Sequence, residues 1–99
     1  MSNREQYIEK MKSKLDDLNS EISKLEAKAR DKKASFKEDY DEEIKVLKGK
    51  REEAGEKLDE LRSASDSAWE EVKRGLENAW NSVTNSVSSA KQKIKEKTE

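Results

Sequence analysis

The chain has 99 residues, of which 22 are basic and 23 are acidic, and its formal net charge is −1. A chain of this length forms one domain at most, spanning residues 1–99, and a hydrophobic share of 30% allows only a narrow core. The near balance of charges argues against a nucleic-acid-binding protein, because such proteins usually present a basic face.

The chain contains neither cysteine nor histidine. Disulfides and thiolate metal sites are therefore excluded, and the commonest general base is missing. We identify no catalytic, cofactor-binding or metal-binding residue and expect a protein that is not an enzyme. The first residues, MSNREQYIEK, lack the apolar core of a secretory signal, and no apolar run is long enough to span a membrane. The expected location is the cytoplasm.

Local preferences predict an all-α protein. The sequence has no proline and only three glycines, and it is rich in leucine, alanine, glutamate and lysine, which are good helix formers. In the first thirty residues the apolar side chains alternate between spacings of three and four, which is the heptad pattern of a coiled coil. This stripe consists of Ile8, Met11, Leu15, Leu18, Ile22, Leu25 and Ala29.

The apolar pattern continues after an irregular step. Phe36, Tyr40, Ile44 and Leu47 are spaced 4-4-3, and a heptad with one polar position, Arg51, then runs to Leu61. We favour one long helix over residues 3–62, because the segment between the two patterns contains no glycine, proline or asparagine. The alternative is a break at DKKASFKE, where a serine three residues before a glutamate fits a capping box. That break gives a three-helix bundle.

The segment RSASDSAWEE predicts a turn near residues 62–66, followed by a second helix over residues 67–97. Ser67 and Glu70 fit a capping box, and the serines before them favour non-helical backbone. The second helix then folds back on the first as a coiled-coil hairpin. The hairpin sets four pairs opposite each other: Trp69 with Leu61, Leu76 with Ala54, Val83 with Leu47, and Ile94 with Phe36.

The second helix reaches only half of the long one, so the hairpin leaves the first apolar stripe uncovered. Apolar surface in water is unfavourable, and this predicts a homo-oligomer. The number and orientation of its strands stay open. The residues expected in that interface are Ile8, Met11, Leu15, Leu18, Ile22 and Leu25.

The stretch AWNSVTNSVSSA, residues 79–90, carries no charge in a chain that is 45% charged. One interpretation is a bundle helix with neighbours on two sides, because serine and asparagine are less costly to desolvate than lysine. The other is an amphipathic helix that binds a membrane surface through apolar burial. The residues that would meet the membrane are Leu76, Trp80, Val83 and Val87.

The segments REQYIEKMKSKLDDLNSEISKLEAKA, EEIKVLKGKREEAGEKLDELR and AWEEVKRGLENAWNSV resemble a family of short bacterial coiled-coil proteins associated with stress responses. The resemblance implies a helical, cytoplasmic, non-enzymatic protein and no site residues. The function expected from the sequence is that of a structural or interaction protein. Peripheral membrane binding through residues 75–90 is the main alternative, and a hydrophilic protectant that folds on association is a third.

Overall fold

The computed structural model describes the backbone of residues 3–31 and 34–98 and the side chains of residues 3–31 and 37–93. Three helices of 28, 29 and 30 residues make up the fold: α1 (Asn3–Arg30), α2 (Ala34–Arg62) and α3 (Trp69–Thr98). No strand occurs among these residues, and the expected all-α class is confirmed.

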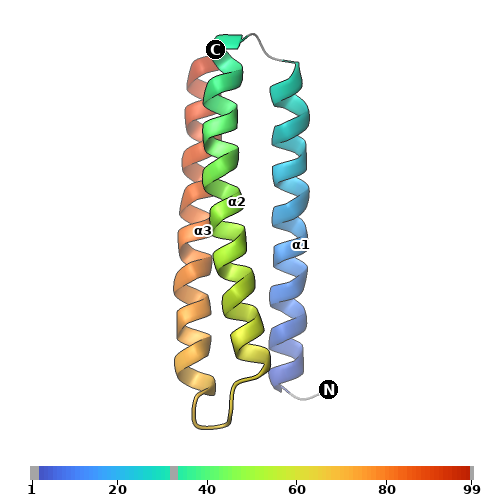
Figure 1. The fold of residues 1–99 in the computed structure, drawn as a ribbon, viewed down its shortest axis with the longest axis vertical. Helices are drawn as coiled ribbons and strands as arrows, with labels where there is room; N and C mark the ends of the chain where they lie inside the picture. The colour runs from blue at the N-terminus through green and yellow to red at the C-terminus, as the bar shows by residue number, and fades with distance from the viewer. Residues whose placement is uncertain (1–2, 32–33, 99) are drawn as a thin grey trace.

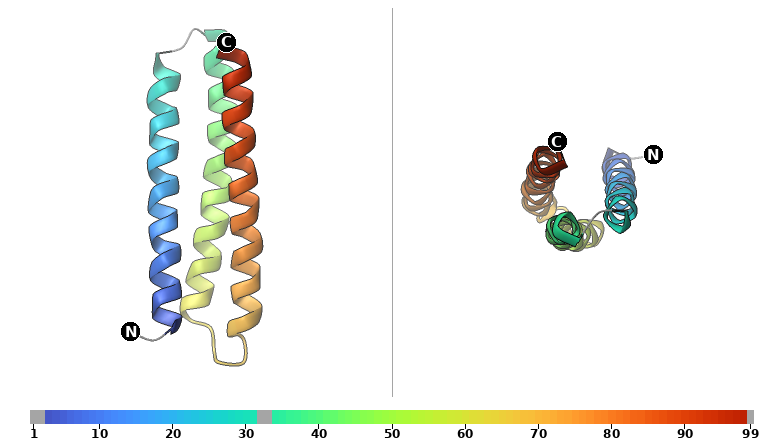
Figure 2. Two further views of the ribbon diagram at one scale, coloured as in Figure 1. Left: turned by 180° about the vertical axis from the view of Figure 1, so that it is seen from behind. Right: turned by 90° about the horizontal axis from the view of Figure 1, so that it is seen from above.

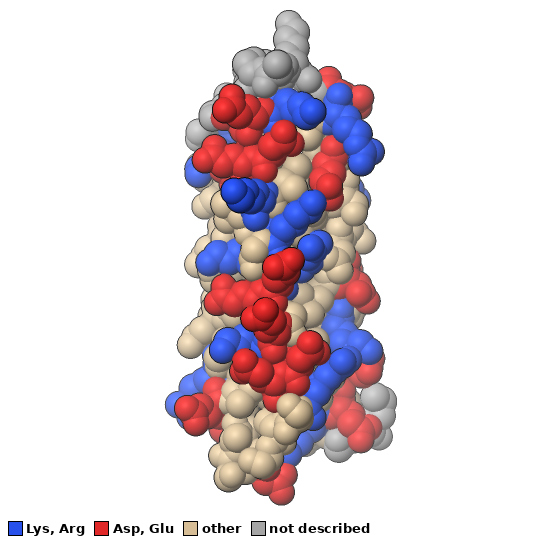
Figure 3. Space-filling model, viewed as in Figure 1, with Lys and Arg blue, Asp and Glu red and all other residues tan. Residues whose placement is uncertain are grey.

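The helices run up, down and up along one axis, so that α1 and α3 are parallel and α2 is antiparallel to both (Figure 1). The bundle is 51 Å long, 21 Å wide and 17 Å deep. Seen from above, α2 lies between α1 and α3, which flank it on two sides (Figure 2). Acidic and basic side chains alternate over the face on which α2 lies in front (Figure 3), as expected of solvated helix surfaces.

The structure contains three helices, so the favoured single helix over residues 3–62 is wrong and the alternative break is present. Helix α1 ends at Arg30, where the amide of Asp31 donates to the carbonyl of Lys28 at 3.2 Å. Residues 32 and 33, on which the alternative turn was placed, lie outside the described residues. The chain folds back although no breaker residue favours it, because the antiparallel return buries the apolar stripes of both segments.

Polar contacts fix the register of α1 against α2. The Lys48 ammonium donates to the Glu26 carboxylate at 3.4 Å. The Arg51 guanidinium donates to the Asn19 side-chain oxygen at 3.1 Å. Arg51, the polar exception in the heptad of α2, therefore stays half-buried and directs its charge toward α1.

The predicted turn after residue 62 is confirmed, with α2 ending at Arg62 and α3 beginning at Trp69. The carbonyl of Ser65 accepts hydrogen bonds from the amides of Ala68 and Trp69 at 3.1 and 2.9 Å. The hydroxyl of Ser67 pairs with that of Ser65 at 3.2 Å, so the expected capping box with Glu70 is not formed. Helix α3 accordingly starts two residues later than predicted.

The core lies along α2, where its apolar stripe meets those of α1 and α3. Leu47 and Val83 belong to one cluster of buried residues, and Leu61 and Trp69 belong to another, as their predicted pairing requires. Leu76 and Ala54, also predicted to pair, are both buried but belong to different clusters. The side chains of Phe36 and Ile94, a further predicted pair, lie outside the described residues. The largest fully buried side chains come from all three helices: Ile22, Leu47, Leu61, Leu76 and Val83.

The expectation that the first apolar stripe is uncovered is wrong. Met11, Leu18 and Ile22 are only 3%, 4% and 1% exposed, because α2 returns along α1 and covers them. Three other members of the expected interface, Ile8, Leu15 and Leu25, are half-buried and pack against the core clusters. The stripe therefore gives no reason of its own for an oligomer.

Candidate functional site: the groove between α1 and α3

The ribbons of α1 and α3 stand apart on the third side of the bundle, with α2 between them (Figure 2). Among the described residues, no Cα atom of α1 comes within 8 Å of a Cα atom of α3. Close helix packing usually brings axes to 8–10 Å, which places many Cα pairs below that distance. We call the resulting depression the α1–α3 groove.

The groove consists of two adjoining hollows of about 290 and 270 Å³. Lys14 and Trp80 line both hollows and mark the boundary between them. The ammonium of Lys14 lies 5.8 Å from the centre of the Trp80 ring, which is a cation–π distance. Trp80 itself is half-buried, although it packs against both core clusters. Part of a large aromatic surface therefore faces the groove.

Apolar side chains from both helices form the floor of the larger hollow. Leu18 and Val83 are buried there, and Val87 is half-buried beside them. Thr84 and Ser88 stand on the α3 side, and Thr84 donates its hydroxyl to the carbonyl of Trp80 at 3.1 Å. The floor is apolar and the α3 wall is uncharged, which is the character of a surface that packs against another apolar element.

The α1 side of the groove is charged. Lys10, Lys14, Asp17 and Glu21 line the two hollows in that order. Their spacing of three and four residues places them along one face of α1. Glu21 forms an ion pair of 3.7 Å with Lys91 across the groove. Among the residues that line the two hollows, the charge on α1 changes from basic to acidic between Lys14 and Asp17.

The end of the groove near the beginning of α1 is closed by side chains. The Tyr7 hydroxyl donates to the Glu77 carboxylate at 3.3 Å. Burial, followed by the negative charge of Glu77 and this hydrogen bond, raises the pKa of Tyr7 to about 12. The ammonium of Lys73 lies 4.8 Å from the centre of the Tyr7 ring. Tyr7 therefore joins α1 to α3 at a point where their backbones do not meet.

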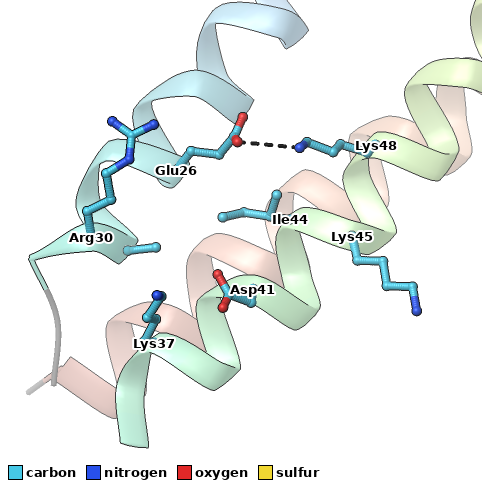
Figure 4. A pocket seen from close by; sticks show the side chains of 8 residues that line it. Glu26, Arg30, Lys37, Asp41, Ile44, Lys45 and Lys48 are labelled. Atoms are coloured by element: carbon cyan, nitrogen blue, oxygen red, sulfur yellow. Dashed lines mark hydrogen bonds and ion pairs between the residues drawn. The ribbon is translucent and has the colours of Figure 1, made fainter. Parts of the chain in front are cut away.

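A separate hollow, of about 500 Å³, lies between α1 and α2 (Figure 4). Lys48 extends across it toward Glu26, whereas Lys45 points away. Every charged residue that lines it is exposed or half-buried. Charges that are exposed or half-buried to this extent do not form a preorganised site for an anion.

The described residues contain neither a cluster suited to a metal ion nor a helix suited to span a membrane. No group of three or more acidic side chains is arranged to hold a metal ion. No helix in this part of the chain combines the length and the apolar character needed to cross a membrane.

Sequence reasoning placed some groove residues correctly and missed others. Of the four residues considered for membrane contact, Leu76 and Val83 are 0% and 2% exposed and face the core. Val83 also forms part of the groove floor, and Trp80 and Val87 are half-buried in the groove. The charged rim of α1 was missed, because the heptad pattern does not say which neighbour each side of a helix faces. Its signal in the sequence is the order of charges at positions 10, 14, 17 and 21.

Comparison of the chain with protein-family models, with curated proteins and with solved structures finds no match. The resemblance to short stress-associated coiled-coil proteins accordingly stays a prediction.

Proposed function

We propose that the protein is a non-enzymatic interaction module that receives a helical polypeptide in the α1–α3 groove. The observation that carries this proposal is an apolar floor between two parallel helices that are too far apart to close it. A bundle of three helices with such a groove is suited to accept a further helix, because the incoming helix packs on both walls at once.

The uncharged wall of α3 supports the proposal. A helix laid against lysine or glutamate forces those groups to lose water or to move aside. Thr84 and Ser88 carry short hydroxyl side chains, which are both donors and acceptors and fit beneath a neighbouring helix. A wall of this composition lowers the cost of docking a helix.

Membrane binding through Leu76, Trp80, Val83 and Val87 is the competing proposal. Leu76 and Val83 are buried against α2, so α3 must leave the bundle before all four residues can enter a lipid surface. Undocking loses about 1.5–3 kcal/mol of burial for each large apolar side chain. This cost is the reason to prefer a polypeptide in the groove.

Photo-crosslinking in the expressing cell tests the proposal. A benzophenone amino acid at Thr84 lies in the groove, and the same residue at Glu53, on the exposed side of α2, is the matched control. We expect Thr84 to crosslink to a polypeptide of defined mass, in a segment whose apolar residues follow a 3-4 spacing. A crosslink to lipid, or a yield at Thr84 no higher than at Glu53, contradicts the proposal.

A further inference from the structure

We propose that the occupant of the α1–α3 groove is a second copy of this chain, packed antiparallel and groove to groove about a twofold axis. The axis runs across the groove, from the α1 rim between Lys14 and Asp17 to the α3 wall at Thr84. In this arrangement α1 faces α1 of the partner subunit and α3 faces α3 of the partner subunit. The inference rests on the proposed function, because it names the partner of the same groove.

The charges on the α1 rim complement themselves in this arrangement. Along α1 the rim carries two basic residues followed by two acidic ones: Lys10, Lys14, Asp17 and Glu21. When two such helices lie antiparallel, Lys14 meets Asp17 of the partner subunit and Lys10 meets Glu21 of the partner subunit. The twofold axis produces each of these pairs twice. A parallel arrangement of the same two rims sets base against base and acid against acid.

The uncharged stretch of α3 fits the same axis. Near a twofold axis a residue faces its own copy, so a charge there meets a like charge. Between Glu77 and Lys91 the sequence has no charged residue, and these two residues of opposite sign each lie seven positions from Thr84. Antiparallel pairing about Thr84 therefore sets Glu77 against Lys91 of the partner subunit. The twofold axis thus explains why the stretch between Glu77 and Lys91 carries no charge.

One twofold axis can pass through both helices. The α1 position between Lys14 and Asp17 and the α3 position of Thr84 lie at the same height along the bundle. Lys14 lies over Trp80, and Glu21 pairs with Lys91. The middle of the α1 rim is therefore level with the part of α3 that follows Trp80. Lys14, Asp17 and Thr84 indeed line the same hollow.

The face is large enough for a stable dimer. The side of the bundle that carries the groove measures 51 Å by 21 Å, which sets an upper limit on the order of 1,000 Å² for the area that a partner can cover. Standard interfaces bury roughly 800 Å² on each partner. The pairing sets position 80 against position 88, so the half-buried ring of Trp80 comes next to the half-buried Val87 of the partner subunit, with one such apolar contact on each side of the axis.

The ion pair between Glu21 and Lys91 within one chain does not oppose formation of the dimer. Glu21 and Lys91 are 39% and 61% exposed in their side chains, and their 3.7 Å contact is that of a weak surface pair. In the dimer Glu21 turns to Lys10 of the partner subunit and Lys91 turns to Glu77 of the partner subunit. The number of ion pairs rises while no charge loses its partner.

Charge reversal tests the inference. By sedimentation equilibrium we expect the wild-type protein to be a dimer at micromolar concentration. Lys14→Glu alone, and Asp17→Lys alone, should each weaken the dimer about tenfold or more, because each sets like charges together twice. An equal mixture of the two variants should form a heterodimer with wild-type affinity, since Glu at position 14 then meets Lys at position 17. Lys45→Glu on α2 is the matched control and should change nothing.

The outcomes separate the inference from the proposed function. A wild-type monomer at 100 μM, or a mixture that associates no better than its components, overturns the second copy as occupant. If the benzophenone at Thr84 nevertheless crosslinks to a different polypeptide, the helix-docking function stands without this inference. If the groove crosslinks to no polypeptide, both are overturned.

Discussion

The ring of Tyr7 meets the ring of Trp69 edge to face, with centroids 6.2 Å apart and planes inclined by 72°. The guanidinium of Arg4 lies 4.7 Å from the centre of the same indole and pairs with Asp66 at 2.7 Å. The first turns of α1 are thereby attached to the start of α3 and to the turn before it. This aromatic contact, and not backbone packing, holds the two outer helices in place at that end of the groove.

We therefore expect the two tryptophans to differ in their contribution to stability. Trp69 is 8% exposed, so Trp69→Ala should lower the free energy of unfolding by about 3–5 kcal/mol. Trp80 is half-buried and faces the groove, so Trp80→Ala should lower the free energy of unfolding of the monomer by clearly less than Trp69→Ala does. Urea unfolding followed by circular dichroism at submicromolar protein measures both losses. Equal losses contradict the placement of Trp80 in the groove.

The phenol of Tyr7 should lose its proton at a higher pH than an ordinary tyrosine does. Its pKa of about 12 lies above the ordinary value of 10.0. The folded state holds the proton more tightly, so the stability due to this group is fully present below pH 10 and is lost as the pH rises toward 12. Absorbance at 295 nm in a Tyr40→Phe background follows Tyr7 alone. Glu77→Gln should lower the pKa of Tyr7, and an unchanged pKa contradicts the contact with Glu77.

The return of α2 along α1 can be measured directly, because the chain has no native cysteine. Spin labels at Lys12→Cys and Asp59→Cys sit on exposed positions next to Met11 and Leu58, which share a core cluster. In the three-helix bundle the labels should lie within about 30 Å, given helix axes roughly 10 Å apart. In one continuous helix the 47-residue separation amounts to about 70 Å. A distance near the larger value excludes the bundle.

Val83 distinguishes a bundle helix from a membrane helix. The side chain is 2% exposed, so Val83→Asp should lower the free energy of unfolding by about 3 kcal/mol or more, since the carboxylate has no partner there. Asn85→Asp, on the exposed side of α3, is the matched control and should stay within about 0.5 kcal/mol. With Val83 intact, the emission of Trp80 in a Trp69→Phe background should not shift when small vesicles are added. A blue shift with vesicles favours the membrane alternative.

Much of this fold follows from spacing in the sequence. The 3-4 pattern identified Met11, Leu18 and Ile22 as apolar helix positions, and serine and aspartate marked the turn before Trp69. The reversal after α1 had one local signal, the capping box in DKKASFKE, which left it an alternative to the long helix. That signal could not decide between the two, because the benefit of the reversal comes from burial against α2, which only the folded chain provides.

The groove could not be predicted from the sequence, for a related reason. A helical stripe gives the direction in which side chains point, but it does not give the distance to the next helix. Lys14 and Asp17 look like ordinary surface residues until α3 is known to stand opposite them without closing the gap. The order of their charges along α1 points to an interface only when it is considered together with the uncharged wall around Thr84.

The central claim is that Thr84 lies on a twofold axis and faces its own copy. Thr84→Cys places one thiol at that point, and Glu53→Cys places one on the far side of α2. Disulfide-linked dimer formed under mild oxidation is then measured on non-reducing gels for both variants at equal concentration. We predict rapid and nearly complete linkage at position 84 and slow, diffusion-dependent linkage at position 53. Equal rates at the two positions, or faster linkage at position 53, contradict the claim.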